Sequence, residues 1–243
     1  MVEIERLGLL KMDFLGLRTL TVIHDTELAV RRKDPDFRIA NLDYDDPDTY
    51  AMLAKGETEG IFQLESTGMT QVLVGMRPKN LEDIIALISL YRPGPMDSIP
   101  TYLRNRKDPS HVTYKTPQMA HIVDVTNGVV IYQEQVMQIC RELAGFSFGQ
   151  ADNVRRAMSK KKLKVMEAER EHFVHGCKEP GKECAGCVAN GVPENIANEI
   201  YDDMISFASY AFNKSHAACY AYVAFQTAYL KCHYPHEFMA ALL

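Results

Sequence analysis

Apolar residues recur at helical spacing along most of this chain. Leu81, Ile84, Ile85 and Ile88, for example, form one apolar stripe that predicts a buried helix face, and Asn80 is placed to cap that helix. Helices are expected over residues 19–33, 80–91, 133–144, 150–160, 163–175, 193–208 and 215–233, with another opening at 235. The pattern therefore predicts a mainly α-helical fold.

Two short segments have the pattern of strands instead. Residues 9–15 alternate, so that Lys11 and Asp13 would project from the same strand face. The segment 128–132 (GVVIY) is a second strand candidate. We therefore expect a short β element beside the helices.

The sequence YRPGPM ends the helix at Tyr91, because its prolines and glycine cannot continue a helix. A mobile basic loop with Arg104, Arg106 and Lys107 is expected after it.

Composition is that of a globular chain of one large domain or two small ones. It has 243 residues, of which 47% are hydrophobic and 24% charged, so a disordered or fibrous protein is excluded. No apolar run approaches the roughly 20 residues that span a bilayer, and the first ten residues lack the basic and apolar pattern expected of a signal peptide. We expect a cytoplasmic protein without a membrane partner, with reduced cysteines.

The net charge of −5 hides two opposed regions. Residues 34–59 are acidic and residues 155–164 are basic. The basic residues are Arg155, Arg156, Lys160, Lys161, Lys162 and Lys164. Since local fields steer a polyanion, the basic run is a candidate phosphate site, although a solvated helix end explains it about as well.

Three further motifs carry candidate chemistry. Asp13 and Lys11 have the charges that phosphoryl transfer needs to hold Mg²⁺ and to neutralise phosphate, but a solvated salt pair on a strand explains them better from spacing alone. The run 210–216 (YAFNKSH) precedes a long helix, and Ser215 as its N-cap would leave backbone N–H groups free for an anion. The alternative is an ordinary capped helix start.

The cysteines Cys177, Cys184 and Cys187 follow His172 and His175 and have the residue types of a structural zinc site. Their spacing is irregular and the surrounding connector, 176–191, is rich in glycine. We therefore expect these cysteines to bind no metal.

Five segments occur together in one order: KMDFLGL, GIFQLES, SLYRPGPM, residues 128–162, and residues 210–243. Together they resemble the alpha subunits of bacterial DNA polymerase III, the C-family replicative DNA polymerases. The resemblance covers nearly the whole chain and departs most in the connector. It implies that residues 1–18 are the C-terminal edge of a nucleotidyltransferase-like palm and that 19–243 are helical fingers, truncated at their C-terminal side.

The resemblance also implies roles for individual residues. Asp13 matches the third of three aspartates that hold two Mg²⁺ ions, and Lys11 matches a lysine near the incoming nucleotide. Arg155 and Arg156 match arginines that meet the triphosphate. Tyr210 and His216 match residues near the sugar, and Asn213 and Lys214 lie in the same nucleotide-binding motif. Primer–template DNA and deoxynucleoside triphosphates are the expected partners. The sliding clamp and other replisome subunits would be reached through regions outside this chain.

The first two metal-binding aspartates of the family have no counterpart ahead of Lys11. We therefore expect this chain to be a fragment that is inactive alone. Its C-terminal run is apolar and has no helix stop signal, which also favours a fragment of a longer protein. The rival interpretation is a stand-alone helical nucleic-acid-binding module, which would need neither Lys11 nor Asp13.

Overall fold

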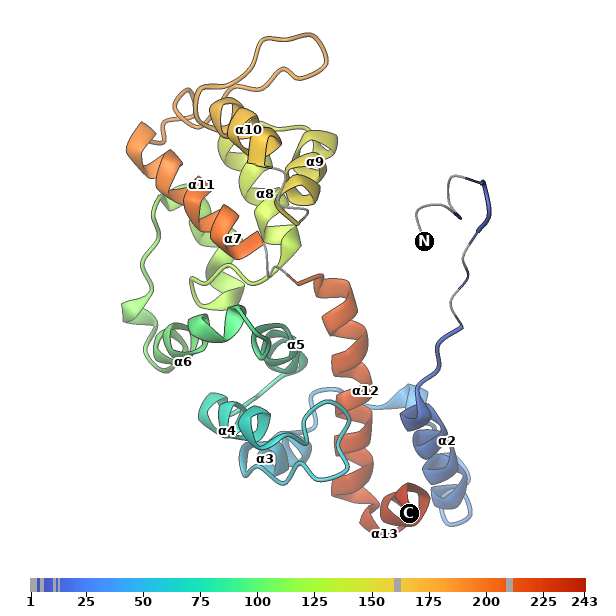
Figure 1. Ribbon diagram of the computed structural model, residues 1–243. Coiled ribbons are helices and arrows are strands. Elements are labelled where there is room, and N and C mark those ends of the chain that lie inside the picture. The colour runs from blue at the N-terminus through green and yellow to red at the C-terminus, as the bar shows by residue number, and fades with distance from the viewer. Residues whose placement is uncertain (1–3, 5–6, 11, 13, 160–162, 209–211) are drawn as a thin grey trace.

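The structure is a computed structural model that describes the chain except residues 1–3, 5–6, 11, 13, 160–162 and 209–211. The described part is almost entirely helical, which confirms the predicted mainly α class (Figure 1). Its α-helices are α2 (Arg18–Val30), α3 (Pro47–Ala54), α4 (Thr67–Met76), α5 (Leu81–Leu90), α6 (Ile99–Lys107), α7 (Ala120–Val123), α8 (Gln133–Ala144), α9 (Phe148–Ser159), α10 (Leu163–His175), α11 (Glu194–Ala208), α12 (Lys214–His233) and α13 (Pro235–Leu242). Short 3₁₀ turns are η1 (Ile39–Asn41), η2 (Pro95–Ser98), η3 (Pro109–His111), η4 (Pro117–Met119) and η5 (Asp124–Thr126).

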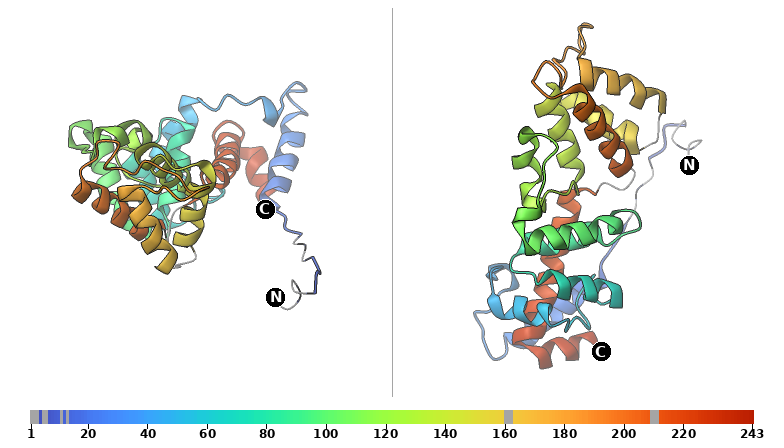
Figure 2. Two further views of the ribbon diagram at one scale, coloured as in Figure 1. Left: turned by 90° about the horizontal axis from the view of Figure 1, so that it is seen from above. Right: turned by 90° about the vertical axis from the view of Figure 1, so that its left-hand side faces the viewer.

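Two hydrophobic cores divide most of the molecule. The first joins α3, α4, α5 and α6 to α12, and we call residues 47–107 with 214–233 the α12 lobe. The second is formed by the five consecutive helices from α7 through α11, and we call residues 117–208 the α8 lobe. The two lobes are stacked end to end in Figure 2, with α12 reaching up to the α8 lobe. The long helix α12 therefore contributes side chains to the first core and also connects the two lobes.

A smaller cluster closes the far end of α12. Val22 and Ile23 of α2 pack there with Leu230 of α12 and Phe238 of α13. This cluster joins the first and last described helices, which lie side by side in both figures.

Local sequence explains where helix α8 begins and ends. The Gln135 side chain accepts the backbone N–H groups of Ile131 and Tyr132 at 2.8 and 2.9 Å, which satisfies donors at the helix entrance. Gly145 ends the helix with φ +75°, a conformation that glycine adopts without steric cost. The predicted range 133–144 is confirmed.

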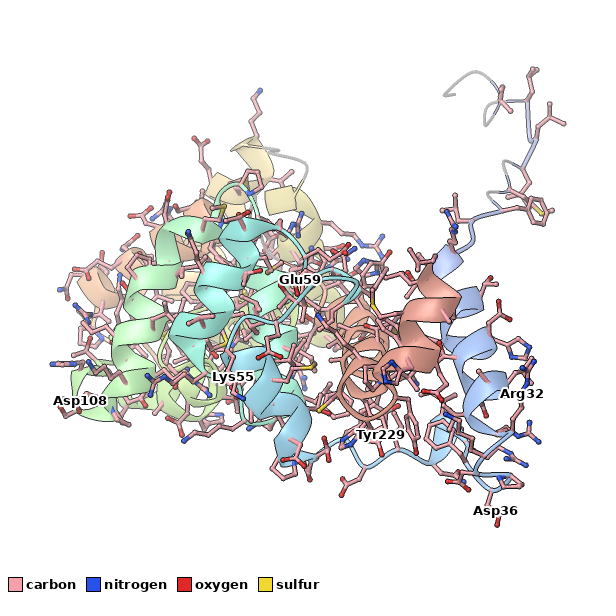
Figure 3. All side chains as sticks on the ribbon, turned by 90° about the horizontal axis from the view of Figure 1, so that it is seen from below. Arg32, Asp36, Lys55, Glu59, Asp108 and Tyr229 are labelled. Atoms are coloured by element: carbon pink, nitrogen blue, oxygen red, sulfur yellow. The ribbon has the colours of Figure 1, made fainter. Side chains whose placement is uncertain are left out.

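The expected strand over 9–15 is wrong for the described residues, none of which belongs to a strand. Leu10, Phe14 and Leu15 are 83%, 89% and 93% exposed. A strand needs a neighbour for its hydrogen bonds, and the N-terminal segment runs away from both lobes (Figure 1). Figure 3 shows its side chains standing apart from the side chains that cover the body of the molecule.

Two other expectations are also corrected. The segment 128–132 forms no strand, only an isolated parallel bridge between Tyr132 and Phe212. The expected mobile loop with Arg104, Arg106 and Lys107 is helix α6. Helix α6 is fixed because the guanidinium of Arg106 makes a two-pronged ion pair with Asp83 of α5, at 2.5 and 2.6 Å.

Candidate functional site at the junction of the two lobes

The predicted site residues fall into three groups. Lys11, Asp13 and Tyr210 lie outside the described residues. Arg155 and Arg156 lie on α9 of the α8 lobe. Asn213, Lys214 and His216 lie at the start of α12.

Backbone hydrogen bonds tie the entrances of α8 and α12 together. The N–H of Phe212 donates to the carbonyl of Ile131 at 3.3 Å, and the N–H of Gln133 donates to the carbonyl of Phe212 at 3.0 Å. We call residues 131–134 and 212–216 the junction, because these segments connect the two lobes. The junction brings two helix N-termini, with their partial positive charge, side by side.

The N-terminus of α12 is capped by Asn213, which corrects the expected cap at Ser215. The Asn213 side-chain oxygen accepts the N–H of His216 at 2.9 Å. Asn213 is the better cap because its oxygen reaches the N–H three residues on, whereas Ser215 already lies inside the helix.

An anion from within the protein lies at this helix start. The Glu134 carboxylate accepts the N–H of Lys214 at 3.1 Å and the side-chain N–H of Asn213 at 3.2 Å. Glu134 of α8 therefore occupies donors at the N-terminus that the sequence offered as an anion site, and binding of a ligand phosphate there stays a prediction.

The side chain of Lys214 is held between the two lobes. Its ammonium group pairs with Glu82 of α5 at 3.0 Å and lies 5.3 Å from the centre of the Tyr132 ring. Tyr132 is buried, and burial raises the pKa of its hydroxyl. The buried ring is therefore neutral and presents its face to the lysine.

Arg155 and Arg156 share one carboxylate. Nη2 of Arg155 lies 2.7 Å from one oxygen of Asp152, and Nε of Arg156 lies 2.7 Å from the other. The hydrogen bond from Arg155 lowers the pKa of the Asp152 carboxyl. Two guanidinium groups thus share the Asp152 carboxylate, and the Arg156 side chain is 65% exposed.

Arg155 also connects α9 to the junction. Its Nη1 donates to the Gln133 side-chain oxygen at 3.0 Å, and the backbone N–H of Gln133 donates to Phe212. The structure therefore brings the arginines of the α8 lobe and the start of α12 into one chain of contacts. Lys160, predicted to share a face with Arg156, lies outside the described residues.

His216 lies in a row of aromatic rings. Its ring is 5.4 Å from that of Phe212 and 4.3 Å from that of Tyr220. The exposed imidazole is thus oriented on both sides by ring contacts. Together the junction offers oriented cations and planar rings, which suit a ligand with phosphates and a flat or cyclic group.

The cysteine connector lies at the other end of the α8 lobe. Cys177 and Cys184 exchange both backbone hydrogen bonds, at 3.0 and 2.9 Å, and all three cysteines are free thiols. Cys187 is fully buried, and burial raises its pKa to about 12. Among the residues that the structure describes, no three His, Cys, Asp or Glu side chains gather as a metal site requires. The absence of zinc stays a prediction.

Sequence reasoning missed Asp152 and Glu134. Asp152 precedes the two arginines by three and four residues, a helical ion-pair spacing that was visible in the sequence. Glu134 carried no such signal, because its partners lie about 80 residues further along the chain.

None of the described helices is both long and apolar enough to span a bilayer.

Comparison with known proteins gives consistent similarities. Residues 19–181 match the family model described as the bacterial DNA polymerase III alpha subunit finger domain. The chain is 51% identical to the DNA polymerase III subunit alpha of Thermus aquaticus over 249 aligned residues, and 47% identical to that of Staphylococcus epidermidis over 244. Both alignments cover 100% of this chain, but only 20% and 22% of those relatives, so the chain spans about a fifth of their length.

Proposed function

Since this chain belongs to the finger-domain family of the bacterial DNA polymerase III alpha subunit, we propose that it binds the incoming deoxynucleoside triphosphate for template-directed DNA synthesis. The proposal concerns the full-length protein that carries the chain, which would act as a DNA-directed DNA polymerase in the cytoplasm. Primer–template DNA is the second substrate. The sliding clamp and other replisome subunits would bind elsewhere on the full-length protein.

The observation that carries the proposal is the pair of arginines on one carboxylate. Asp152 holds both guanidinium groups in place before any ligand arrives, and the Arg156 side chain remains largely exposed. A triphosphate brings more negative charge than Asp152 and can take over part of these contacts. Charge that develops on the leaving pyrophosphate would be offset by the same two residues.

His216 is proposed to lie beside the sugar. Phe212 and Tyr220 fix its ring, so its imidazole can contact a ribose or deoxyribose in one orientation. A group held in this way can discriminate at the 2′ position by shape and by hydrogen bonding. Tyr210 is assigned to the same part of the site by the family resemblance.

The metal ions are a separate part of the proposal. Among the residues that the structure describes, no three possible ligands gather, and the roles given above to Arg155, Arg156 and His216 are argued from their own contacts. The assignment of Asp13 as one Mg²⁺ ligand, and of Lys11 beside the nucleotide, rests on the family resemblance. If it is right, the full-length protein must supply the other ligands.

Single-nucleotide extension of a primed template tests the proposal. We expect the full-length protein to extend the primer and the 243-residue chain to be inactive. Asp13→Asn should abolish extension by the full-length protein while leaving its thermal unfolding unchanged. Extension at the wild-type rate by Asp13→Asn would remove Asp13 from the site.

The same assay separates the rival function. A nucleic-acid-binding module would bind the oligonucleotide but would not extend it, in the full-length protein as in the fragment. That result would replace the polymerase proposal with the rival one.

A further inference from the structure

Arg92 lies at the junction and plays no part in the site described above. It follows the last residue of α5 by two positions, and its side chain is exposed. Its guanidinium carbon lies 4.3 Å from the centre of the Phe212 ring. Phe212 is the junction residue whose backbone bonds to Ile131 and Gln133.

The backbone of Arg92 is fixed at both of its polar groups. Its N–H donates to the carbonyl of Leu90 at 2.8 Å, and its carbonyl accepts the N–H of Met96 at 3.2 Å. Pro93 restricts the backbone further, because the helical region is disfavoured for a residue that precedes proline. Arg92 is therefore held in place by its backbone and by the ring beneath its side chain.

The stacked guanidinium keeps its hydrogen-bond donors available. The guanidinium carbon lies over the ring of Phe212, and a contact with an aromatic face leaves N–H groups available for hydrogen bonds to an anion. Among the residues that the structure describes, Arg92 makes no ion pair with a carboxylate. Its side chain contacts the ring of Phe212. Arg106 differs from Arg92, because its guanidinium N–H groups donate to the buried carboxylate of Asp83.

Two arginines thus approach Phe212 from opposite lobes. Arg92, which follows α5, contacts the ring of Phe212, and Arg155 of the α8 lobe reaches its carbonyl through Gln133. The planar N–H fork of arginine matches two oxygens of one phosphate group. Among the described residues, Arg92 makes no ion pair, and it contacts the same residue that Arg155 reaches through Gln133, so the two arginines can serve one anion with several phosphates.

We propose that Arg92 binds phosphate oxygens at the junction, opposite Arg155 and Arg156. The phosphates come either from the nucleoside triphosphate or from the DNA backbone. Phe212 is then a positioning residue, which sets the guanidinium plane. The choice between the two phosphate sources rests on the proposed function, but phosphate binding itself does not.

The test uses the full-length protein that carries this chain, with Arg92→Ala, Arg92→Lys and a control. Arg141→Ala is the matched control, because Arg141 is an exposed arginine 5.8 Å from the centre of the Phe148 ring and lies away from the junction on α8. Affinity for dATP is measured on a complex with a chain-terminated primed template, so that no turnover is needed. Affinity for the primed template alone is measured across a series of salt concentrations.

Arg92→Ala should weaken one of these affinities about ten-fold, as expected for the loss of a charge-assisted contact. A loss confined to dATP assigns the triphosphate. A loss in DNA affinity, with the slope of log affinity against log salt reduced by about one, assigns the DNA backbone. Arg92→Lys keeps the charge without the fork and should recover part of the loss, and this partial rescue distinguishes binding from a folding defect.

Unchanged affinities in Arg92→Ala would overturn the inference, and so would an equal loss in Arg141→Ala. The outcome is separable from that of the proposed function. If the full-length protein never extends a primer, but Arg92→Ala still weakens its affinity for dATP or DNA, then the phosphate site is supported and the polymerase proposal fails. If the full-length protein extends the primer normally and Arg92→Ala leaves both affinities unchanged, then the polymerase proposal stands and the phosphate site at Arg92 fails.

Discussion

The two lobes are stabilised in different ways. In the α12 lobe, the long helix α12 packs along α5, and a buried ion pair between Asp83 and Arg106 holds α6 in place. In the α8 lobe, the connector 176–191 is held by backbone contacts: Gly186 packs against the main chain of His175 and Gly176, and Gly176 packs against that of Cys184 and Ala185. At the junction, hydrogen bonds join the two lobes, and Ile131 and Tyr132 are also buried in the core of the α12 lobe. Each lobe can therefore be perturbed separately, and the proposed site draws cations from both.

The largest effect is expected in the α12 lobe. Arg106→Met leaves Asp83, which is only 4% exposed, without its charge partner, and should lower the free energy of unfolding by about 3–5 kcal/mol. Amide exchange should accelerate in α5 and α6 before it does in α8 and α10. Arg104→Met, an exposed position on the same helix, is the control and should change stability little. Equal costs for the two variants would contradict a structural role for the ion pair.

A smaller effect is expected from the connector of the α8 lobe. In Gly186→Ala the new Cβ would lie 2.3 Å from the Gly176 nitrogen, at a φ of +81°. Backbone displacement and left-handed strain should together cost about 2–4 kcal/mol. Gly181→Ala is a matched control with φ +82° and no atom within 4 Å, and should cost only the strain, about 1–2 kcal/mol.

Thermal unfolding of the two glycine variants gives the difference directly. Amide exchange then shows whether Gly186→Ala loosens α8 and α10 while α5 stays protected. Equal stability of the two variants would mean that the close approach of Gly176 and Gly186 does not stabilise this lobe.

The smallest effect is expected at the junction. Glu134→Gln keeps the shape of the side chain but removes the charge at the N-terminus of α12, at a cost of about 0.3–1 kcal/mol. Exchange should accelerate at Lys214 and His216 without a change in either core. The control is Glu167→Gln, an exposed position on α10. Loss of protection in both cores would show that the lobes are not separable at this point.

The sequence predicted the helices well where local signals determine them. Asn80 caps α5 and Gly145 ends α8 as expected, because both depend on a residue and its close neighbours. The strand over 9–15 was wrong because alternation predicts which faces a strand would have but supplies no partner strand. The loop over α6 was wrong because Arg106 finds its partner 23 residues earlier in the chain.

The candidate site follows the same division. Short stretches of sequence were enough to single out Arg155, Arg156 and the start of α12, although the cap of α12 is Asn213 and not the expected Ser215. Their arrangement depends on Gln133, Glu134 and Phe212, which come together only through the crossing of two distant segments. The periodicity and spacing of residues along the chain cannot predict contacts between segments that are distant in sequence.

The affinity of the full-length protein for dATP in the presence of a primed template tests the central claim, that the junction binds a nucleoside triphosphate through cations of the α8 lobe. Arg155→Ala should weaken this affinity at least ten-fold, since a charge-assisted contact is lost, while affinity for the primed template and thermal unfolding change little. Arg141→Ala should leave all three at wild-type values. Unchanged dATP affinity in Arg155→Ala would contradict the account.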